Sequence, residues 1–412
     1  MEISAEQLEL VNERIKALEK AESFYGKKLE EAGIHEVHSP GDFKKLPFSE
    51  KKDLRDAYPL GLMTAPEEEI VRIHSSSGTT GKPVIIPYTK KDVDDWATMF
   101  ARCYEMAGIT KKDRLQITPG YGLWTAGIGF QAGCEKLGAM AIPMGPGNTD
   151  KQIEMMIAME STVLCATSSY ALLLAEEIEK RGLVDQIKLK KGVIGSERWS
   201  DKMRNKISGI LGIELYDIYG LTEIYGPGIG INCKGQKHMH YWDDFIYIEI
   251  IDPKTGKNLP DGEWGEIVIT TLKKEGAPLI RYRTHDLSRI IPGKCSCGSP
   301  YPRIDIIQGR TDDMMKIHGV NVFPSQIEEI IAEFDEATSE YQIRISHLDG
   351  KDTMRLYIEA TSGRTDFNDL SQRVAERVKS KIGFTPIVKV VEEGLLPRSE
   401  KKAKRVIDER FE

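Results

Sequence analysis

The first part of the chain has apolar residues at helical spacing. They recur at intervals of three and four positions: Leu8, Val11, Ile15 and Leu18. This periodicity predicts one face of an amphipathic helix. Ser4 and Gln7 stand at its start as in a capping box, and Gly33 marks its predicted end. We expect this helix to serve packing and not chemistry.

The middle of the chain alternates two patterns. Between about residues 92 and 219, helical periodicity is interrupted by short apolar runs. These runs are 139–143, 163–167 and 192–194. The alternation predicts an α/β fold with a parallel sheet covered by helices. After Gly226 the chain is rich in β-forming residues between Pro and Gly turns, which predicts a smaller, distorted barrel-like lobe. Its strand runs are 244–252, 265–272 and 279–282.

A new series of helical and strand patterns begins after residues 309–312. Beyond this point it predicts a helix, two strands joined by a turn, a second helix and a last strand. The predicted ranges are 324–334 for the first helix, 349–350 for the turn, 366–382 for the second helix and 387–391 for the strand. These elements form an α+β module of about a hundred residues, near the lower end of domain sizes. We therefore expect two domains, 1–309, with the β-rich lobe at about 227–308, and 310–412.

Composition narrows the class of protein. The 412 residues include 57 basic and 64 acidic ones, which gives a net charge of −7, and 40% are hydrophobic, enough for a sizeable core. No long run of one charge is present, so nothing favours nucleic acid as a partner. No apolar stretch approaches the roughly 20 residues of a membrane span, and the first residues lack a signal-peptide pattern. We expect a cytoplasmic protein without membrane contact.

A segment rich in small and hydroxyl residues follows the first helical region. It holds two glycines, five hydroxyls and a lysine: Ser75, Ser76, Ser77, Gly78, Thr79, Thr80, Gly81 and Lys82. The glycines let backbone amides turn inward, and the hydroxyls and the lysine can bind phosphate oxygens. Because Pro83 and β-branched residues come next, the loop leads into a strand, unlike the P-loop that opens a helix. We interpret it as a hairpin tip that wraps a triphosphate; the alternative is a solvated linker.

A second segment has the same character. An apolar strand pattern at 213–218 breaks at Gly220, and a hydroxyl and a carboxylate follow at Thr222 and Glu223. Taken alone, Thr222 and Glu223 are also compatible with the start of a helix. Together with the first loop, this segment resembles the adenylate-forming superfamily of acyl-CoA ligases.

Further segments resemble one branch of that superfamily, the phenylacetate-CoA ligases. They match its motifs in order and spacing at 120–127, 167–172, 195–199, 281–287, 309–313, 319–324 and 397–405. The resemblance runs from about Leu46 to the C-terminus. It implies a large multi-lobed N-terminal domain and a small mobile C-terminal domain. It also implies an ATP-dependent, AMP-forming ligase that uses Mg²⁺ and converts an aromatic or related carboxylic acid, through an acyl-adenylate, to its CoA thioester.

The resemblance assigns nucleotide contacts to particular residues. The loop at 75–82 holds the β- and γ-phosphates, Thr222 contacts the α-phosphate, and Glu223 binds Mg²⁺. Asp286 accepts hydrogen bonds from the ribose, helped by Arg310. The residues that border the adenine, or belong to the same segment, are Ser196, Glu197, Arg198, Asp217, Tyr219 and Gly220.

The resemblance also assigns roles in the C-terminal domain. Lys402 reaches the carboxylate and the α-phosphate during adenylation, although Lys401 replaces the glycine that precedes this lysine in the family. Asp312 occupies the hinge about which the domain rotates before thioester formation. The residues that then border the pantetheine tunnel of CoA are Gly319, Val320 and Asn321.

The acyl pocket implied by the resemblance is mostly apolar and suits a flat aryl group. Its residues are Tyr121, Leu123, Trp124, Gly127, Ile128, Gly195 and Tyr225. Trp124 and Ala126 are bulkier than the residues that relatives often have at these positions. The identity of the acid is therefore left open: it is phenylacetate or an acid that is smaller or differently shaped.

The six cysteines fall into two groups. Three stand singly among apolar residues and are predicted to be buried: Cys103, Cys134 and Cys165. The others, Cys233, Cys295 and Cys297, can supply three of the four soft ligands of a closed zinc site. His238 and His240 would point to one face of a strand, so periodicity leaves the fourth ligand open, and the resemblance places it at His240. The alternative is reduced cysteines that hold no metal.

Two other functions remain compatible with the sequence. The same adenylation can serve a different acceptor, either a redox cofactor or the thiol of a carrier protein. A zinc-containing, non-catalytic binding protein would keep the fold and lose the chemistry. On the main interpretation the partners are small molecules only, namely the acid, ATP and CoA. The oligomeric state is open, with a homodimer as one option.

Overall fold

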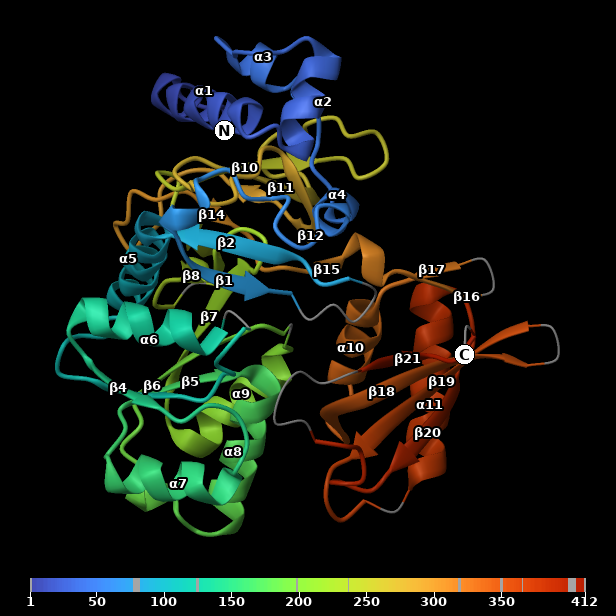
Figure 1. Cartoon of the computed structure of the whole chain (residues 1–412). Helices are drawn as coiled ribbons and strands as arrows, with labels where there is room; N and C mark the ends of the chain where they lie inside the picture. The colour runs from blue at the N-terminus through green and yellow to red at the C-terminus, as the bar shows by residue number, and fades with distance from the viewer. Residues whose placement is uncertain are drawn as a thin grey trace. The chain divides into compact units, whose positions relative to one another are not determined.

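The computed structural model describes residues 2–76, 82–123, 126–197, 199–235, 237–317, 320–348, 351–364, 366–398 and 405–410. The chain forms two compact units. The first comprises Met1–Ala166, Ile187–Ser196 and Glu214–Ile307, and the second Thr167–Gln186, Glu197–Ile213 and Gln308–Glu412. Figure 1 shows the mixture of helices and sheets along the chain.

Two helices replace the single long helix predicted at the N-terminus. α1 (Ala5–Lys20) begins at the predicted capping box and buries the four predicted apolar residues. The helix ends at Lys20, and Ser23 starts α2 (Phe24–Ala32) by accepting a hydrogen bond from the Gly26 amide. A Cβ on Gly26 would lie 2.7 Å from a carbonyl oxygen of α1, so the two helices approach closely here. Gly33 ends α2 in the left-handed conformation, with a φ of 65°.

A nine-stranded sheet carries the predicted parallel strands (Figure 1). Its order is β13-β14-β9-β8-β7-β6-β5-β3-β4. The strands are β3 (Arg114–Ile117), β4 (Met140–Pro143), β5 (Val163–Thr167), β6 (Lys191–Gly195), β7 (Glu214–Leu221), β8 (Gly226–Asn232), β9 (Met239–Tyr241), β13 (Ile290–Ile291) and β14 (Arg303–Ile304). β3 pairs parallel with β4 and β5, and β6 with β7, as predicted. From β7 to β8 and onward the pairing is antiparallel, so the direction of the sheet changes at β7.

Helices alternate with the parallel strands along the chain, which confirms the predicted α/β pattern. They are α5 (Lys90–Met106), α6 (Ala126–Leu137), α7 (Thr149–Ala158), α8 (Ser168–Lys180) and α9 (Asp201–Leu211). α5 and α6 pack side by side (Figure 1). In the described parts of the chain, no helix combines the length and the apolar character needed to cross a membrane.

A second, open sheet of four strands stands where the sequence predicts a barrel-like lobe. Its order is β10-β11-β12-β15, with β10 (Ile246–Ile251), β11 (Gly265–Thr271), β12 (Tyr282–Ser288) and β15 (Gly309–Arg310). β12 begins where the predicted run 279–282 ends. The reason lies at Arg281, which has a positive φ of 47° and pairs with the buried Glu249 carboxylate at 3.0 Å. Asp286 consequently lies inside a strand.

A two-stranded hairpin precedes both sheets. β1 (Ile70–Ser75) pairs antiparallel with β2 (Ile85–Thr89), which confirms the predicted hairpin setting of the Ser/Thr/Gly segment. The short helices of the chain are α3 (Pro40–Phe43), α4 (Lys51–Asp56), η1 (Glu67–Glu69), η2 (Val184–Gln186) and η3 (Thr311–Asp313).

The last part of the chain has the predicted α+β pattern and a core of its own. Its elements are β16 (Met315–Ile317), β17 (Val320–Val322), α10 (Pro324–Ala332), β18 (Ala337–Leu348), β19 (Lys351–Ala360), α11 (Phe367–Ile382), β20 (Ile387–Val391) and β21 (Val406–Asp408). The sheet order is β20-β19-β18-β21. The predicted turn at 349–350 lies outside the described residues, and β21 was not predicted because a strand of three residues has no readable period. The predicted domain limits, 1–309 and 310–412, remain a prediction.

Candidate functional site

Strand β7 leads into the segment predicted to bind the nucleotide. It is followed by the turn Thr222–Tyr225 and by β8, which returns antiparallel. A Cβ on Gly220 would lie 2.0 Å from the Gly226 carbonyl oxygen, so glycine is required for this close approach. The candidate phosphate and magnesium ligands therefore lie in a tight turn and not at the start of a helix.

Glu223 is buried in this turn and faces a lysine. Only 6% of its surface is exposed, and the Lys51 ammonium on α4 lies 3.4 Å from Glu223 Oε1. A carboxylate that already holds a cation at this place has the charge and the oxygen atoms that a divalent metal requires. Lys51 was not predicted as a site residue, because no spacing links it to a residue so far along the chain. The available signal was its place just after Leu46, where the family resemblance begins.

Asp286, on β12 of the four-stranded sheet, contacts a residue of β7. The Tyr219 hydroxyl donates a hydrogen bond to Asp286 Oδ2 at 2.7 Å, and both side chains are buried. The Asp286 amide in turn donates to Thr284 Oγ1 at 3.0 Å, which fixes the start of the side chain on β12. The structure thus brings together two residues that were predicted to bind different parts of one nucleotide, the adenine and the ribose.

Two further candidates lie on the neighbouring strands β6 and β7. The Asp217 amide donates to Asn232 Oδ1 at 2.5 Å, so β7 is held from β8 at this point. A Cβ on Gly195 would lie 2.5 Å from the Ile218 carbonyl oxygen, which explains the glycine at the end of β6. Ser196 follows with an exposed side chain and a φ of 71°.

Glu197 is already engaged with a helix in the second unit. Its carboxylate accepts hydrogen bonds from the Ser169 amide at 3.0 Å and from the Ser168 hydroxyl at 3.1 Å. These contacts place a negative charge at the N-terminus of α8, where the helix dipole favours it. Its predicted contact with adenine stays a prediction, and Arg198 lies outside the described residues.

The predicted phosphate loop is described at both of its ends. The Ser76 amide donates to the Val84 carbonyl oxygen, and Ser76 Oγ accepts from the Val84 amide, each at 3.0 Å. Ser75 is buried, whereas Lys82 is exposed, with its ammonium 5.7 Å from the centre of the Tyr58 ring. The candidates Ser77, Gly78, Thr79, Thr80 and Gly81 lie outside the described residues.

The predicted acyl segment packs against the start of this loop. The Leu123 carbonyl oxygen accepts a hydrogen bond from the Ser75 amide at 2.9 Å. Gly127 gives room to the half-buried Tyr121, because a Cβ there would lie 2.8 Å from Tyr121 Cδ2. The other candidates are Ile128, half-buried, Tyr225, fully buried, and Trp124, outside the described residues.

Among the C-terminal candidates, the structure joins two. Arg310 Nε and Nη2 donate to Asp312 Oδ1 and Oδ2 at 2.8 and 2.9 Å. The predicted ribose helper and the predicted hinge residue thus form a bidentate ion pair. Val320 and Asn321 lie on β17, and Asn321 is exposed. Gly319 and Lys402 lie outside the described residues.

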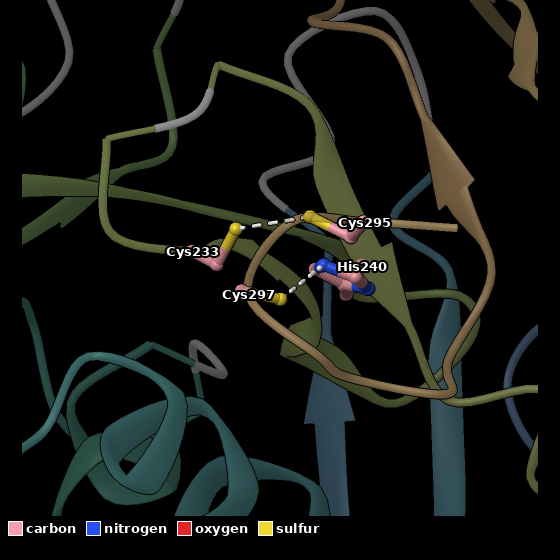
Figure 2. A group of neighbouring side chains, drawn as sticks. All are labelled: Cys233, His240, Cys295 and Cys297. Atoms are coloured by element: carbon pink, nitrogen blue, oxygen red, sulfur yellow. Dashed lines mark hydrogen bonds between the residues drawn. The ribbon is translucent and has the colours of Figure 1, made fainter. Parts of the chain in front are cut away.

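Figure 2 shows three cysteines and one histidine that point toward one another. The ligand atoms of Cys233, His240, Cys295 and Cys297 all lie within 4.8 Å of one another. Cys233 Sγ lies 3.6 Å from Cys295 Sγ, and Cys297 Sγ lies 3.4 Å from His240 Nε2. Three sulfurs and one imidazole nitrogen are a donor set that suits tetrahedral zinc.

The structure distinguishes between the two candidate histidines. His240 Nδ1 lies 2.8 Å from the Tyr301 carbonyl oxygen, so a proton on Nδ1 is donated there and Nε2 is left to face the sulfurs. His238 Nε2 instead lies 3.8 Å from Asp305 Oδ1. Burial disfavours the thiolate of Cys295, but hydrogen bonds from the neighbouring cluster residues outweigh it and lower the pKa of Cys295 to about 6. The cysteines predicted to be buried in the core are buried: Cys103, Cys134 and Cys165.

Comparison with known families and proteins gives matches along most of the chain. The family described as AMP-binding enzyme matches residues 11–272, and the one described as AMP-binding enzyme C-terminal domain matches residues 319–410. Phenylacetate-coenzyme A ligase of Pseudomonas putida is 41% identical over 396 residues, which cover 94% of this chain and 90% of that protein. Phenylacetate-coenzyme A ligase of Escherichia coli (strain K12) is 41% identical over 394 residues, with 93% and 90% covered.

Solved structures of 2-hydroxyisobutyryl-CoA ligase are also similar. The crystal structure in the postadenylation state, in complex with 2-HIB-AMP, has a TM-score of 0.88 at 28% identity and covers 98% of this chain and 89% of that chain. The structure of that ligase with 2-HIB-AMP and CoA, in the thioesterification state, has a TM-score of 0.69 at 28% identity, with 98% and 89% covered. Both similarities extend over the nucleotide candidates and the C-terminal module.

Proposed function

Because this chain belongs to the AMP-binding enzyme family, in its phenylacetate-CoA ligase branch, we propose that it is an ATP-dependent, AMP-forming ligase that joins a carboxylic acid to CoA. In the first step a carboxylate oxygen bonds to the α-phosphorus of ATP, the bond to the bridging oxygen breaks, and pyrophosphate leaves. In the second step the CoA thiol loses its proton, its sulfur bonds to the acyl carbon, and AMP leaves with the electron pair of the acyl–oxygen bond.

The contact between Tyr219 and Asp286 carries this proposal. It places the residue proposed for the adenine side within 2.7 Å of the residue proposed for the ribose hydroxyls. The chain continues from Tyr219 directly into the turn that holds Thr222 and Glu223. Strand β7 with Tyr219, the facing Asp286 carboxylate, and Thr222 in the turn after β7 would therefore contact the base, the ribose and the α-phosphate of one nucleotide.

The phosphates are proposed to lie between the turn and the hairpin. Thr222 contacts the α-phosphate, and the loop at 75–82 wraps the β- and γ-phosphates. Mg²⁺ bound by Glu223 would neutralise phosphate charge during adenylation. The Lys51 ammonium, now paired with Glu223, supplies a second positive charge beside the same carboxylate.

The C-terminal residues are proposed to serve the two steps in turn. Lys402 stabilises the charge of the adenylation transition state. A rotation about Asp312 then brings Gly319, Val320 and Asn321 to the pantetheine arm of CoA. The domain limits 1–309 and 310–412 belong to this proposal, since the hinge lies just after Arg310.

A structural zinc ion is proposed for the cysteine cluster. With Cys233, His240, Cys295 and Cys297 as ligands, the coordination is complete, and no position is left for substrate or water. The geometry of the donor set supports this ion. The hydrogen bond from His240 to the Tyr301 carbonyl supports the orientation of the imidazole ring, with Nε2 toward the ion. The ion would hold the antiparallel edge of the nine-stranded sheet and take no part in the reaction.

The acid is proposed to be aromatic, which rests on the relatives named phenylacetate-coenzyme A ligase. Pyrophosphate release over a panel of carboxylic acids, with and without CoA, tests the proposal. We expect release that depends on an aryl acid and, with CoA, AMP and an acyl-CoA as products. If CoA is not consumed, a redox cofactor or a carrier-protein thiol is the acceptor; if no acid gives release, the proposal is wrong. A cytoplasmic location and a homodimer stay predictions.

A further inference from the structure

A buried lysine lies behind the catalytic turn, as we call residues 222–225. Lys274, in the connection between β11 and β12, has no exposed surface. Its ammonium donates a hydrogen bond to the Ile224 carbonyl oxygen. It also lies 4.1 Å from the centre of the Tyr88 ring and 4.5 Å from that of the Tyr225 ring, within reach of cation–π attraction to both.

Lys274 joins two segments that serve the phosphates in the proposed function. Ile224 belongs to the catalytic turn, and Tyr88 belongs to β2, the strand that follows the phosphate loop. The Tyr88 hydroxyl donates to the Tyr225 carbonyl oxygen at 2.9 Å. Two consecutive carbonyl groups of the turn are therefore held, one by Lys274 and the next by the hairpin.

The connection that carries Lys274 is itself anchored. The Asp92 carboxylate, at the start of α5, accepts hydrogen bonds from the amides of Glu275 and Gly276, each at 2.8 Å. A Cβ on Gly276 would lie 2.5 Å from the Pro87 carbonyl oxygen, so glycine lets the connection lie against β2. The ammonium is consequently fixed relative to both α5 and the hairpin.

Stability alone does not account for a lysine at this place. Burial lowers the pKa of Lys274 to about 7, while Asp92 and Glu223 act in the opposite direction. An apolar side chain of similar length would fill the same space without removing a charge from water. Charged groups with strongly shifted pKa values gather at functional sites. The position beside the catalytic turn agrees with a role in the reaction.

We propose that Lys274 is a positioning residue for adenylation, an inference that rests on the proposed function. It sets the catalytic turn against the phosphate-binding hairpin, so that the contacts to the α-phosphate and those to the β- and γ-phosphates keep a fixed separation. Adenylation requires this separation, because the bond that breaks lies between the α-phosphorus and the departing pyrophosphate. Thioester formation from a finished acyl-adenylate involves no β- or γ-phosphate and does not require it.

Lys274→Met tests the inference, with Lys273→Met as the matched control. Lys273 is the preceding residue, partly exposed, and its ammonium pairs with Asp244 at 3.3 Å, away from the turn. In ATP-free protein we expect amide hydrogen exchange at residues 222–225 to be faster in Lys274→Met than in the wild type and unchanged in the control. Pyrophosphate release should fall about a hundredfold in Lys274→Met, the size of effect that a small misplacement of reacting groups produces. Thioester formation from presynthesised acyl-adenylate should stay near the wild-type rate.

Two results would overturn the inference: equal loss of both half-reactions, or unchanged hydrogen exchange at the turn in Lys274→Met. Tyr88→Phe keeps the ring and removes the hydroxyl that holds the next carbonyl, so it tests the same arrangement if Lys274→Met does not fold. It should slow adenylation and spare thioester formation, and loss of both steps would again count against the inference. If the wild type releases no pyrophosphate with any acid, the proposed function fails instead.

Discussion

The Tyr219 hydroxyl donates a 2.7 Å hydrogen bond to the Asp286 carboxylate and so joins β7 of the nine-stranded sheet to β12 of the four-stranded sheet. Tyr219→Phe removes that bond and leaves the ring in place. We expect KM for ATP to rise about tenfold, because the carboxylate loses the group that orients it. Asp286→Asn should raise KM for ATP further, since it removes the carboxylate that is proposed to accept hydrogen bonds from the ribose hydroxyls. Steady-state kinetics with varied ATP measures both, and a normal KM in both variants would contradict the ribose assignment.

Glu223→Gln is expected to abolish pyrophosphate release and thioester formation. A neutral amide binds Mg²⁺ poorly, and the Lys51 ammonium loses its partner at 3.4 Å. Glu177→Gln, on the surface of α8, is the control and should be unaffected. Near-normal pyrophosphate release by Glu223→Gln would show that the turn is structural only.

Protein purified without added metal should contain close to one zinc ion per chain by elemental analysis. His240→Gln is expected to lose the metal, because its Nε2 faces the three sulfurs. His238→Gln should keep it, since His238 lies toward Asp305 instead. Zinc-free wild type would support the alternative of reduced cysteines without a metal, and a metal needed for turnover would argue against a purely structural ion.

Lys402→Ala is expected to slow adenylation by a hundredfold or more, about 3 kcal/mol of lost transition-state stabilisation. With presynthesised acyl-adenylate and CoA, the same variant should form thioester at close to the normal rate. Lys401→Ala and Lys404→Ala are the controls and should adenylate nearly normally. A sensitive Lys401 would shift the assignment by one residue, and equal loss of both steps in Lys402→Ala would argue against alternation of the C-terminal domain.

Lowering the pH should lower the free energy of unfolding of the protein in part through protonation of His74. Burial lowers the pKa of His74 to about 4; the Leu123 carbonyl opposes this shift, and Arg72 and Lys274 add to it. Since the unfolded chain takes up the proton near its ordinary pKa of about 6.5, it binds more protons than the native state between pH 4 and 6.5. The contribution of His74 to the free energy of unfolding is therefore complete above pH 6.5 and is lost as the pH falls toward 4.

Thermal unfolding between pH 4 and 8 measures this effect. In His74→Phe, a ring still packs between Tyr88 and Trp96, whose ring centres lie 5.2 and 5.5 Å from that of His74. The Tm of the wild type minus that of His74→Phe should fall as the pH drops from 6.5 to 4 and stay level above 7. His38→Gln, a change at an exposed histidine, is the control. A constant difference for His74→Phe would rule out the shifted pKa.

Local pattern predicted the elements that a short apolar run or a helical period marks in the sequence by itself. The parallel strands β4, β5 and β6 were predicted because each short apolar run lies between helical segments. The break between α1 and α2 was missed, because apolar spacing continues across it and the break depends on the close approach of Gly26 to the preceding helix. The strand β12 was displaced for a similar reason, since Arg281 turns toward a glutamate on β10.

At the candidate site, too, contacts between residues distant in sequence could not be predicted from local pattern. The motifs around Glu223 and Asp286 were recognised as segments, but their meeting through Tyr219 depends on how two sheets lie together. Lys274 was missed because its neighbours come from β2, α5 and the catalytic turn, and no spacing along the chain relates these elements. Periodicity left the choice between His238 and His240 open and only the resemblance placed the ligand at His240; the contact that orients His240, with the Tyr301 backbone carbonyl just before β14, has no signal in the local sequence.

The path of the chain through the two sheets makes the segment that carries Asp286 a separable unit. β9 and β13 both belong to the nine-stranded sheet, and the three strands between them, β10, β11 and β12, all belong to the other. Cys233 stands before this excursion and Cys295 after it, with their sulfur atoms 3.6 Å apart. The chain thus leaves the nine-stranded sheet and returns to it at neighbouring points, as an inserted segment does. Recombination between relatives at these two points would exchange Asp286 and its supporting strands together, while the parallel half of the nine-stranded sheet keeps its own sequence.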